Sequence, residues 1–148
     1  MTHITFLWVD KTKFAWLREG IEFYRKRLTH YVRVEVREAP AGPTPKIEGD
    51  NLLKLIPKGS LIFALDIKGD TVNSSDLARL LAGLETAGHS HFCFIIGGAY
   101  GLSQEVLQSA HRRLSLSSLT FTHDMSRLIL MEQLYRAYSI IAGAPYHH

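Results

Sequence analysis

The stretch best suited to binding a ligand is residues 92–102, FCFIIGGAYGL. Residues 92–96 form an unbroken apolar run of aromatic and β-branched side chains, which predicts a strand buried on both faces. Three glycines follow within residues 97–101, and glycine allows positive φ and close approach of a ligand to the backbone. Ser103 can then cap a helix over residues 104–112. This order indicates a ligand-binding edge at the carboxyl end of a parallel strand.

A glycine-rich segment can also be a simple tight turn, a dinucleotide site or a phosphate-binding loop. The sequence favours some of these roles over others. The glycines can serve only a tight turn, an alternative that composition leaves open. A dinucleotide site is disfavoured because the spacing is G-G-x-x-G, and because Ser117 and Ser118 stand where an acidic residue would bind ribose. The sequence also contains neither the Gly-Lys-Ser/Thr of a P-loop nor the G-x-S-x-G of a hydrolase nucleophile.

Composition is typical of a folded protein, with 148 residues, 46% hydrophobic and 21% charged. We expect one domain over residues 1–148. No apolar run approaches the ~20 residues of a membrane helix and no signal peptide is evident, so we expect a cytoplasmic protein without a membrane partner. One cysteine, Cys93, and scattered histidines predict neither a disulfide nor a metal site. The net charge of +3 permits a polyanionic partner without requiring one.

Strand and helix patterns alternate along the rest of the chain. Strands are predicted at residues 4–9, 32–37, 61–66, 92–96 and, rich in serine, 114–119. The first predicted helix follows a cap at Asp10 and runs to Leu28. The third starts at Ser74 or Ser75 and ends near Gly88. The second, fourth and fifth are predicted at residues 52–56, 104–112 and 124–142. Residues 39–49 hold three prolines and predict a surface loop. Repeated βα units predict an α/β fold with a mostly parallel sheet and helices on both faces.

Four motifs together resemble the SPOUT-class methyltransferases that modify N3 of a pseudouridine in 23S ribosomal RNA. They are FIIGGAYGL at 94–102, LSLSSLTF at 114–121, EQLYRAY at 132–138 and PYH at 145–147. The resemblance covers essentially the whole chain. It implies a C-terminal trefoil knot, which periodicity alone does not predict because knots are rare. It also implies a homodimer in which each active site is completed by the other subunit. One departure is Thr122, where the family usually has proline.

The resemblance further implies S-adenosylmethionine as the cofactor. The residues it assigns to this ligand are Leu65, Gly97, Leu116, Ser117, Ser118, Leu119, Thr120 and Phe121. These types suit the ligand, because leucines can sandwich a flat adenine while backbone groups around Gly97 and Ser118 bind its edge. Alternatively, the leucines belong to the core and the hydroxyl residues are ordinary turn residues.

Methyl transfer to N3 requires alignment of N3 with the donor methyl group and removal of the imide proton. Candidate groups are His123, Arg127, Arg136, Tyr146 and His147. His147 is suited to accept a proton near neutral pH, and Arg136 can stabilise a developing enolate oxygen or bind a phosphate. Tyr146 can stack on the target base. The alternatives are a surface ion pair of Arg136 with Glu132 and a disordered terminus at His147.

The implied partner is 23S ribosomal RNA within the large subunit or the 70S ribosome, and DNA is not expected. Basic residues of the first helix and Arg112 and Arg113 are candidate phosphate contacts, or a solvated surface. The last helix carries more apolar residues than one face needs, which predicts a dimer interface at Leu128, Met131, Leu134, Tyr135, Tyr138 and Ile141. The rival hypotheses are a non-catalytic ribosome-associated binding or assembly factor and another α/β nucleotide-binding enzyme, and cofactor binding discriminates among them.

Overall fold

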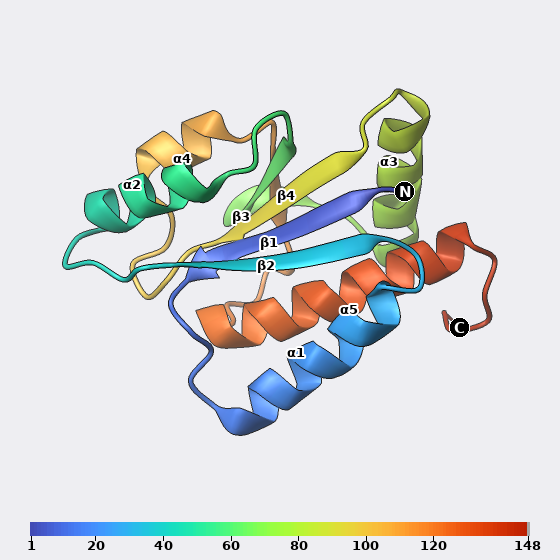
Figure 1. Ribbon diagram of the computed structural model, residues 1–148, viewed down its shortest axis with the longest axis horizontal. Helices are drawn as coiled ribbons and strands as arrows, with labels where there is room; N and C mark the ends of the chain where they lie inside the picture. Colours follow the sequence, from blue (N-terminus) through green and yellow to red (C-terminus); the bar gives the residue numbers. More distant parts are fainter. Residues whose placement is uncertain (148) are drawn as a thin grey trace.

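A five-stranded, fully parallel sheet in the order β2-β1-β4-β3-β5 forms the centre of the protein (Figure 1). The computed structural model describes residues 1–147. The strands are β1 His3–Val9, β2 Arg33–Ala39, β3 Leu61–Thr71, β4 His91–Ile96 and β5 Arg112–Ser115. The helices are α1 Ala15–Leu28, α2 Pro45–Leu55, α3 Ser74–Thr86, α4 Gln104–Ser109 and α5 His123–Ile141. The predicted parallel α/β architecture is confirmed.

Helices cover both faces of the sheet, with α2 and α4 on one face and α1 and α5 on the other, where α3 packs beside α5 (Figure 1). Alternation along the strands divides the core accordingly. Phe92 and Phe94 of β4 pack with α1, α3 and α5, whereas Cys93 and Ile95 pack with α2 and α4. Burial raises the pKa of the Cys93 thiol to about 12, so this cysteine packs as a small apolar residue.

Several predicted boundaries differ from the structure. Helix α2 begins at Pro45, inside the predicted loop, because the Thr44 side chain accepts from the Ile47 N–H at 3.2 Å and proline is tolerated at the first helical position. Asp10 does not cap α1; its φ is +64°, and the helix starts after Phe14. Helix α4 ends at Ser109, before the predicted 112, and Asn73 caps α3 ahead of the predicted serines.

Strand β3 runs past its predicted end at Asp66 and is irregular opposite β5. Leu65 and Asp70 are both paired with Leu114, so residues 66–69 make an excursion between them. Gly69 lies against the β5 backbone, because a Cβ there would come within 2.6 Å of the Arg113 carbonyl carbon. The excursion starts at the carboxyl edge of the sheet, where it contributes Asp66 and Ile67 to a pocket.

Among residues 1–147, no helix is long and apolar enough to span a bilayer.

Two imidazoles are stacked on neighbouring strands of the sheet. His3 of β1 and His91 of β4 have ring centroids 4.2 Å apart, and Thr5 Oγ1 lies 2.9 Å from His91 Nε2. Burial lowers the pKa of His91 below its ordinary 6.5; His3 and Arg37 lower it further, whereas Glu35 opposes them. The unfolded chain therefore binds this proton more tightly than the folded chain. We expect the contribution of His91 to the free energy of unfolding to be constant above about pH 6.5 and to fall as the pH drops below it.

Urea unfolding at about pH 7.5 and about pH 5.5 measures this loss of stability. Carboxylates also protonate in acid, so the contribution of the imidazole is the part of the loss that His91→Gln removes. An equal loss in the variant and the natural chain would assign the pH dependence to other groups.

Candidate functional site

The carboxyl ends of β3, β4 and β5 enclose a pocket of about 440 Å³ with the start of α5. Its lining residues are Leu65, Asp66, Ile67, Ile96, Gly97, Gly98, Ala99, Leu114, Ser115, Leu116, Ser117, Leu119, Thr120, Phe121, Thr122, His123 and Ser126. The pocket therefore contains all the residues predicted to bind the cofactor except Ser118. This position agrees with the general location of ligands in parallel α/β sheets.

The glycine-rich turn after β4 is a compact loop that forms one wall of this pocket. The Gly101 N–H donates to the Gly98 carbonyl at 3.0 Å, and Gly101 has a φ of +75°. A Cβ on Gly97 would lie 2.6 Å from the Gly101 carbonyl carbon, so glycine is required there by the loop itself. Ser103 caps α4 as predicted, because its Oγ accepts from the Val106 N–H at 3.3 Å. The same loop therefore makes a tight turn and lines the pocket.

Residues 116–119, predicted to continue a strand, belong instead to a loop of residues 116–121 that lines the pocket. Strand β5 ends at Ser115, whose Oγ donates to the Ser117 carbonyl at 3.0 Å. The Leu119 N–H donates to Ser117 Oγ at 3.0 Å. These bonds satisfy polar groups within the loop, and the pairing with β3 ends at Ser115. Leu119 is 71% exposed and lines the pocket, so its apolar side chain is accessible to a ligand there.

Thr122, at the family's proline position, starts α5. Its Oγ1 accepts from the Met125 N–H at 3.1 Å, so the hydroxyl caps the helix. The next residue, His123, lines the pocket, and its Nε2 lies 3.4 Å from Asp124 Oδ1. His123 is thus the one predicted catalytic residue that the described chain places at the pocket.

The other three predicted catalytic residues form a separate cluster at the far end of α5. Arg136 Nη1 lies 3.1 Å from His147 Nδ1, and its guanidinium lies 4.8 Å from the Tyr146 ring centroid. Arg136 also forms the ion pair with Glu132 anticipated as an alternative, at 3.1 Å. His123 and Arg136 are 13 residues apart on one helix, or about 20 Å along its axis. The pocket and this cluster are therefore not brought together within one chain.

Packing holds the tail residue Tyr146 against the body of the protein. Its ring contacts Tyr135 edge-on, with centroids 4.7 Å apart. Burial and a hydrogen bond with Tyr24 raise the pKa of Tyr146 to about 12. Tyr146 is therefore protonated at neutral pH and unsuited to accept a proton, whereas its ring and hydroxyl remain available for contacts.

Arg127, a further candidate from the sequence, is fully buried and lies outside the pocket. It donates to the Val9 and Asp10 carbonyls and to Thr12 Oγ1, and its guanidinium lies 4.9 Å from the Trp8 ring centroid. Burial lowers its pKa, an effect that Asp124 opposes. This arrangement links the end of β1 to α5 and is structural.

Glu48 is a residue that the sequence motifs did not identify. Its side chain is buried in the first turn of α2, next to Gly98 of the glycine-rich loop. The signal that would have identified it is the sequence Thr-Pro-Lys-Ile-Glu at residues 44–48. Threonine before proline marks a helix start, and an acidic residue four positions later belongs to its first turn.

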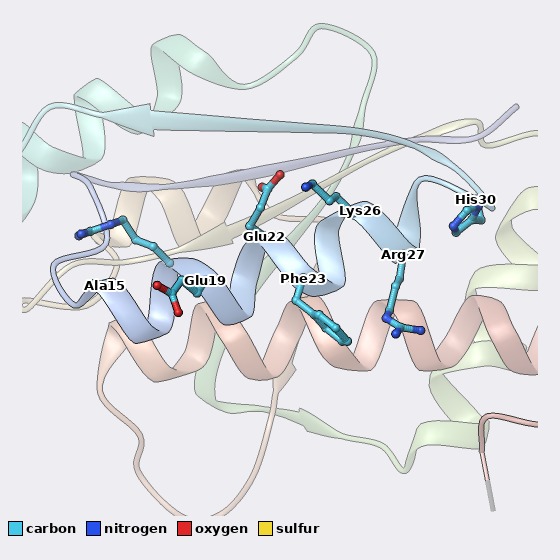
Figure 2. A pocket seen from close by; sticks show the side chains of 8 residues that line it. Ala15, Glu19, Glu22, Phe23, Lys26, Arg27 and His30 are labelled. Atoms are coloured by element: carbon cyan, nitrogen blue, oxygen red, sulfur yellow. The ribbon is translucent and has the colours of Figure 1, made fainter.

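A second hollow lies along the outer side of α1 (Figure 2). It has a volume of about 830 Å³, and its lining residues all come from α1 and the turn after it. Figure 2 shows Glu19, Glu22, Phe23, Lys26 and Arg27 along this one helix. Arg27 lies over the Phe23 ring, 4.3 Å from its centroid. In the described chain no other element contributes a side chain, so this hollow lacks the convergent groups of a binding site.

Among residues 1–147, no three His, Cys, Asp or Glu side chains are grouped to hold a metal ion.

Comparisons with known proteins point to one family. Residues 2–147 match the family described as predicted SPOUT methyltransferase. Two relatives named ribosomal RNA large subunit methyltransferase H, from Geotalea daltonii and Halothermothrix orenii, are 43% and 44% identical. The alignments cover 96% and 97% of this chain, and 97% and 98% of the relatives. A probable methyltransferase structure from Bordetella pertussis has a TM-score of 0.60 at 13% identity, covering 93% of this chain and 95% of that one.

Proposed function

Because this chain belongs to the SPOUT methyltransferase family, we propose that it methylates N3 of a pseudouridine in 23S ribosomal RNA, with S-adenosylmethionine as the donor. The observation that most directly supports this function is the pocket at the carboxyl edge of β3, β4 and β5. Relatives over nearly the whole chain are named for methylation of large-subunit ribosomal RNA. The four sequence motifs support the pseudouridine target. We place the reaction on the ribosome, and therefore in the cytoplasm.

The chemistry of the pocket wall fits S-adenosylmethionine. Leu65, Leu116 and Leu119 supply apolar surface for a flat base, and Leu119 is largely exposed. Gly97 and Gly98 present backbone without side chains. When bound, this cofactor supplies an electrophilic methyl group. The contribution of the chain is to hold the donor, exclude water and position the base.

The separation of pocket and tail supports a composite active site in a homodimer. Arg136 and His147 lie at the opposite end of α5 from the pocket. They can act at a pocket only if it belongs to another copy of the chain. In that arrangement His147 would accept the N3 proton, Arg136 would stabilise the pyrimidine oxygen, and Tyr146 would contact the base. His123 would line the cofactor side of the same site.

The predicted interface on α5 requires revision, because the chain itself covers most of that surface. Met131, Leu134, Tyr135 and Tyr138 are buried against α1, α3 and the sheet. Three exposed aromatic residues lie instead on α1 and just before it, at Phe14, Trp16 and Phe23. Tyr146 of the tail packs near Tyr24 of the same helix. We therefore place the two-fold interface along α1 and beside the tail.

The family also implies the trefoil knot. The excursion of residues 66–69, which leaves both Leu65 and Asp70 opposite Leu114, is compatible with a chain threaded at this edge of the sheet. We propose that the loop of residues 116–121 and α5 form the threaded segment.

Leu119→Ala should lower the affinity for S-adenosylmethionine about tenfold, because the ligand loses apolar contact worth about 1.5 kcal/mol. The fold should be unaffected, since the leucine is 71% exposed. Calorimetric titration measures the affinity, and Ile47→Ala is a matched control because Ile47 is exposed and outside the pocket. Unchanged affinity in Leu119→Ala would place the ligand elsewhere. Cofactor binding without methylation of ribosomes would favour the assembly-factor alternative.

Light scattering at low micromolar concentration should report about twice the chain mass of 16.7 kDa. Phe23→Asp should shift the protein to the monomer, because it places a charge in the proposed apolar interface. Ile47→Asp introduces the same charge on α2 and should leave the dimer intact. A natural chain that remains monomeric would contradict both the dimer and the composite site.

A further inference from the structure

Glu48 is a buried carboxylate with one oxygen unsatisfied. The residue is 6% exposed, and its Oε2 accepts from the Gly42 N–H at 3.2 Å. Its Oε1 is buried and has no hydrogen-bond partner among residues 1–147. No Lys, Arg or His side chain among these described residues forms an ion pair with Glu48. Buried carboxylates are normally paired, because their desolvation is costly.

The unsatisfied oxygen lies against the glycine-rich loop of the pocket. A Cβ on Gly98 would be 3.2 Å from Glu48 Oε1 and 3.4 Å from Val9. Gly98 lines the pocket, whereas Glu48 does not. Gly98, which has no side chain, therefore lies next to both this carboxylate and the pocket.

At this position a carboxylate affects the pocket through its charge. Unit charges several ångströms apart interact strongly where protein, and not water, lies between them. Asp66 also lines the pocket, but its Oδ1 accepts from the Lys68 N–H and its side chain is only half-buried. Salt and water screen such a group much more than a buried one. Of these two carboxylates, Glu48 is therefore the one that solvent reaches less.

We propose that Glu48 is a specificity-determining residue that makes the pocket prefer a cationic sulfonium ligand to its neutral thioether product. The inference rests on the proposed function. In methyl transfer the S–CH3 bond breaks and the N3–CH3 bond forms, while the bonding pair remains on sulfur and the N3 proton passes to an acceptor. S-adenosylmethionine loses its sulfonium charge and becomes S-adenosylhomocysteine. A buried anion beside the pocket therefore stabilises the bound substrate and weakens retention of the product.

Glu48→Gln tests this role, because it removes the charge at nearly constant shape. Calorimetry on the full-length chain compares S-adenosylmethionine, S-adenosylhomocysteine and sinefungin, in which a protonated amine replaces the sulfonium. The variant should bind the two cationic ligands roughly tenfold more weakly, the effect expected for unit charges about 10 Å apart at an effective dielectric constant of about 20. Its affinity for the neutral thioether should stay within about twofold. Glu105→Gln removes an exposed carboxylate on α4 and should change no affinity.

The ratio of the affinity for a cationic ligand to the affinity for the neutral thioether distinguishes an effect of charge from an effect of packing. Equal weakening of all three ligands would assign Glu48 a purely structural role and overturn the inference, while the proposed function would stand. A natural chain that binds none of them would overturn both. If Glu48→Gln fails to fold, salt dependence in the natural chain provides the second test. Preference for the sulfonium should persist from about 0.05 to about 0.5 M KCl, because a buried charge is poorly screened. A preference that is absent, or lost at high salt, would contradict the role of Glu48.

Discussion

Removal of Tyr146, His147 and His148 should lower methylation of pseudouridine-containing ribosomes at least ~100-fold, the effect of losing a positioned acid–base group. Affinity for S-adenosylmethionine should change by less than about twofold, because neither Tyr146 nor His147 lines the pocket. Single-turnover methylation and calorimetry measure the two quantities separately. The combination of intact binding and lost transfer is what a composite site requires.

Point variants separate the roles within the tail. His147→Ala removes the proposed proton acceptor and one contact of Arg136. Tyr146→Phe keeps the ring packed on Tyr135 and serves as the matched control for the fold of the tail. Full activity in the truncated chain would return the catalytic role to Arg136 or to His123, which lines the pocket.

Local patterns were sufficient to predict the sheet and most helices. β4 illustrates why: its apolar run is buried on both faces, and the alternating residues Phe94 and Cys93 join the two cores. The start of α2 was missed because a cluster of prolines favours a loop, although Thr44 and Pro45 are favourable helix-start residues. The end of β5 was missed because Ser115 and Ser117 bond within their own loop, which hydropathy does not reveal.

The local pattern predicted the glycine-rich edge, the family resemblance assigned residues 116–121 to the same site, and neither predicted contacts between distant segments. Residues 116–121 and Gly97 meet because parallel strands end at one edge of the sheet. Glu48 approaches that edge from the opposite face, through α2, so no sequence spacing links it to Gly98. The separation of His123 from Arg136, in contrast, follows from helix rise alone and favours a two-subunit site before any contact is known.

Arg127→Ala should lower the free energy of unfolding by about 3–5 kcal/mol, the range for removing one member of a buried charged network. The guanidinium is fully buried and donates to Val9, Asp10 and Thr12. Its loss would leave those oxygens unpaired in the interior and Asp124, 3.6 Å away, as a buried anion without its cation. Urea unfolding at neutral pH measures the change.

Arg79→Ala is the matched control, because Arg79 also pairs with an aspartate but its side chain is 72% exposed. Its effect should be below about 1 kcal/mol, since exposed ion pairs contribute little. Arg127→Lys should retain the charge but recover only part of the stability, because an ammonium lacks the planar donors that reach three acceptors at once. A stable Arg127→Ala protein that had lost methylation alone would contradict the structural assignment. It would return Arg127 to the catalytic candidates, despite its complete burial.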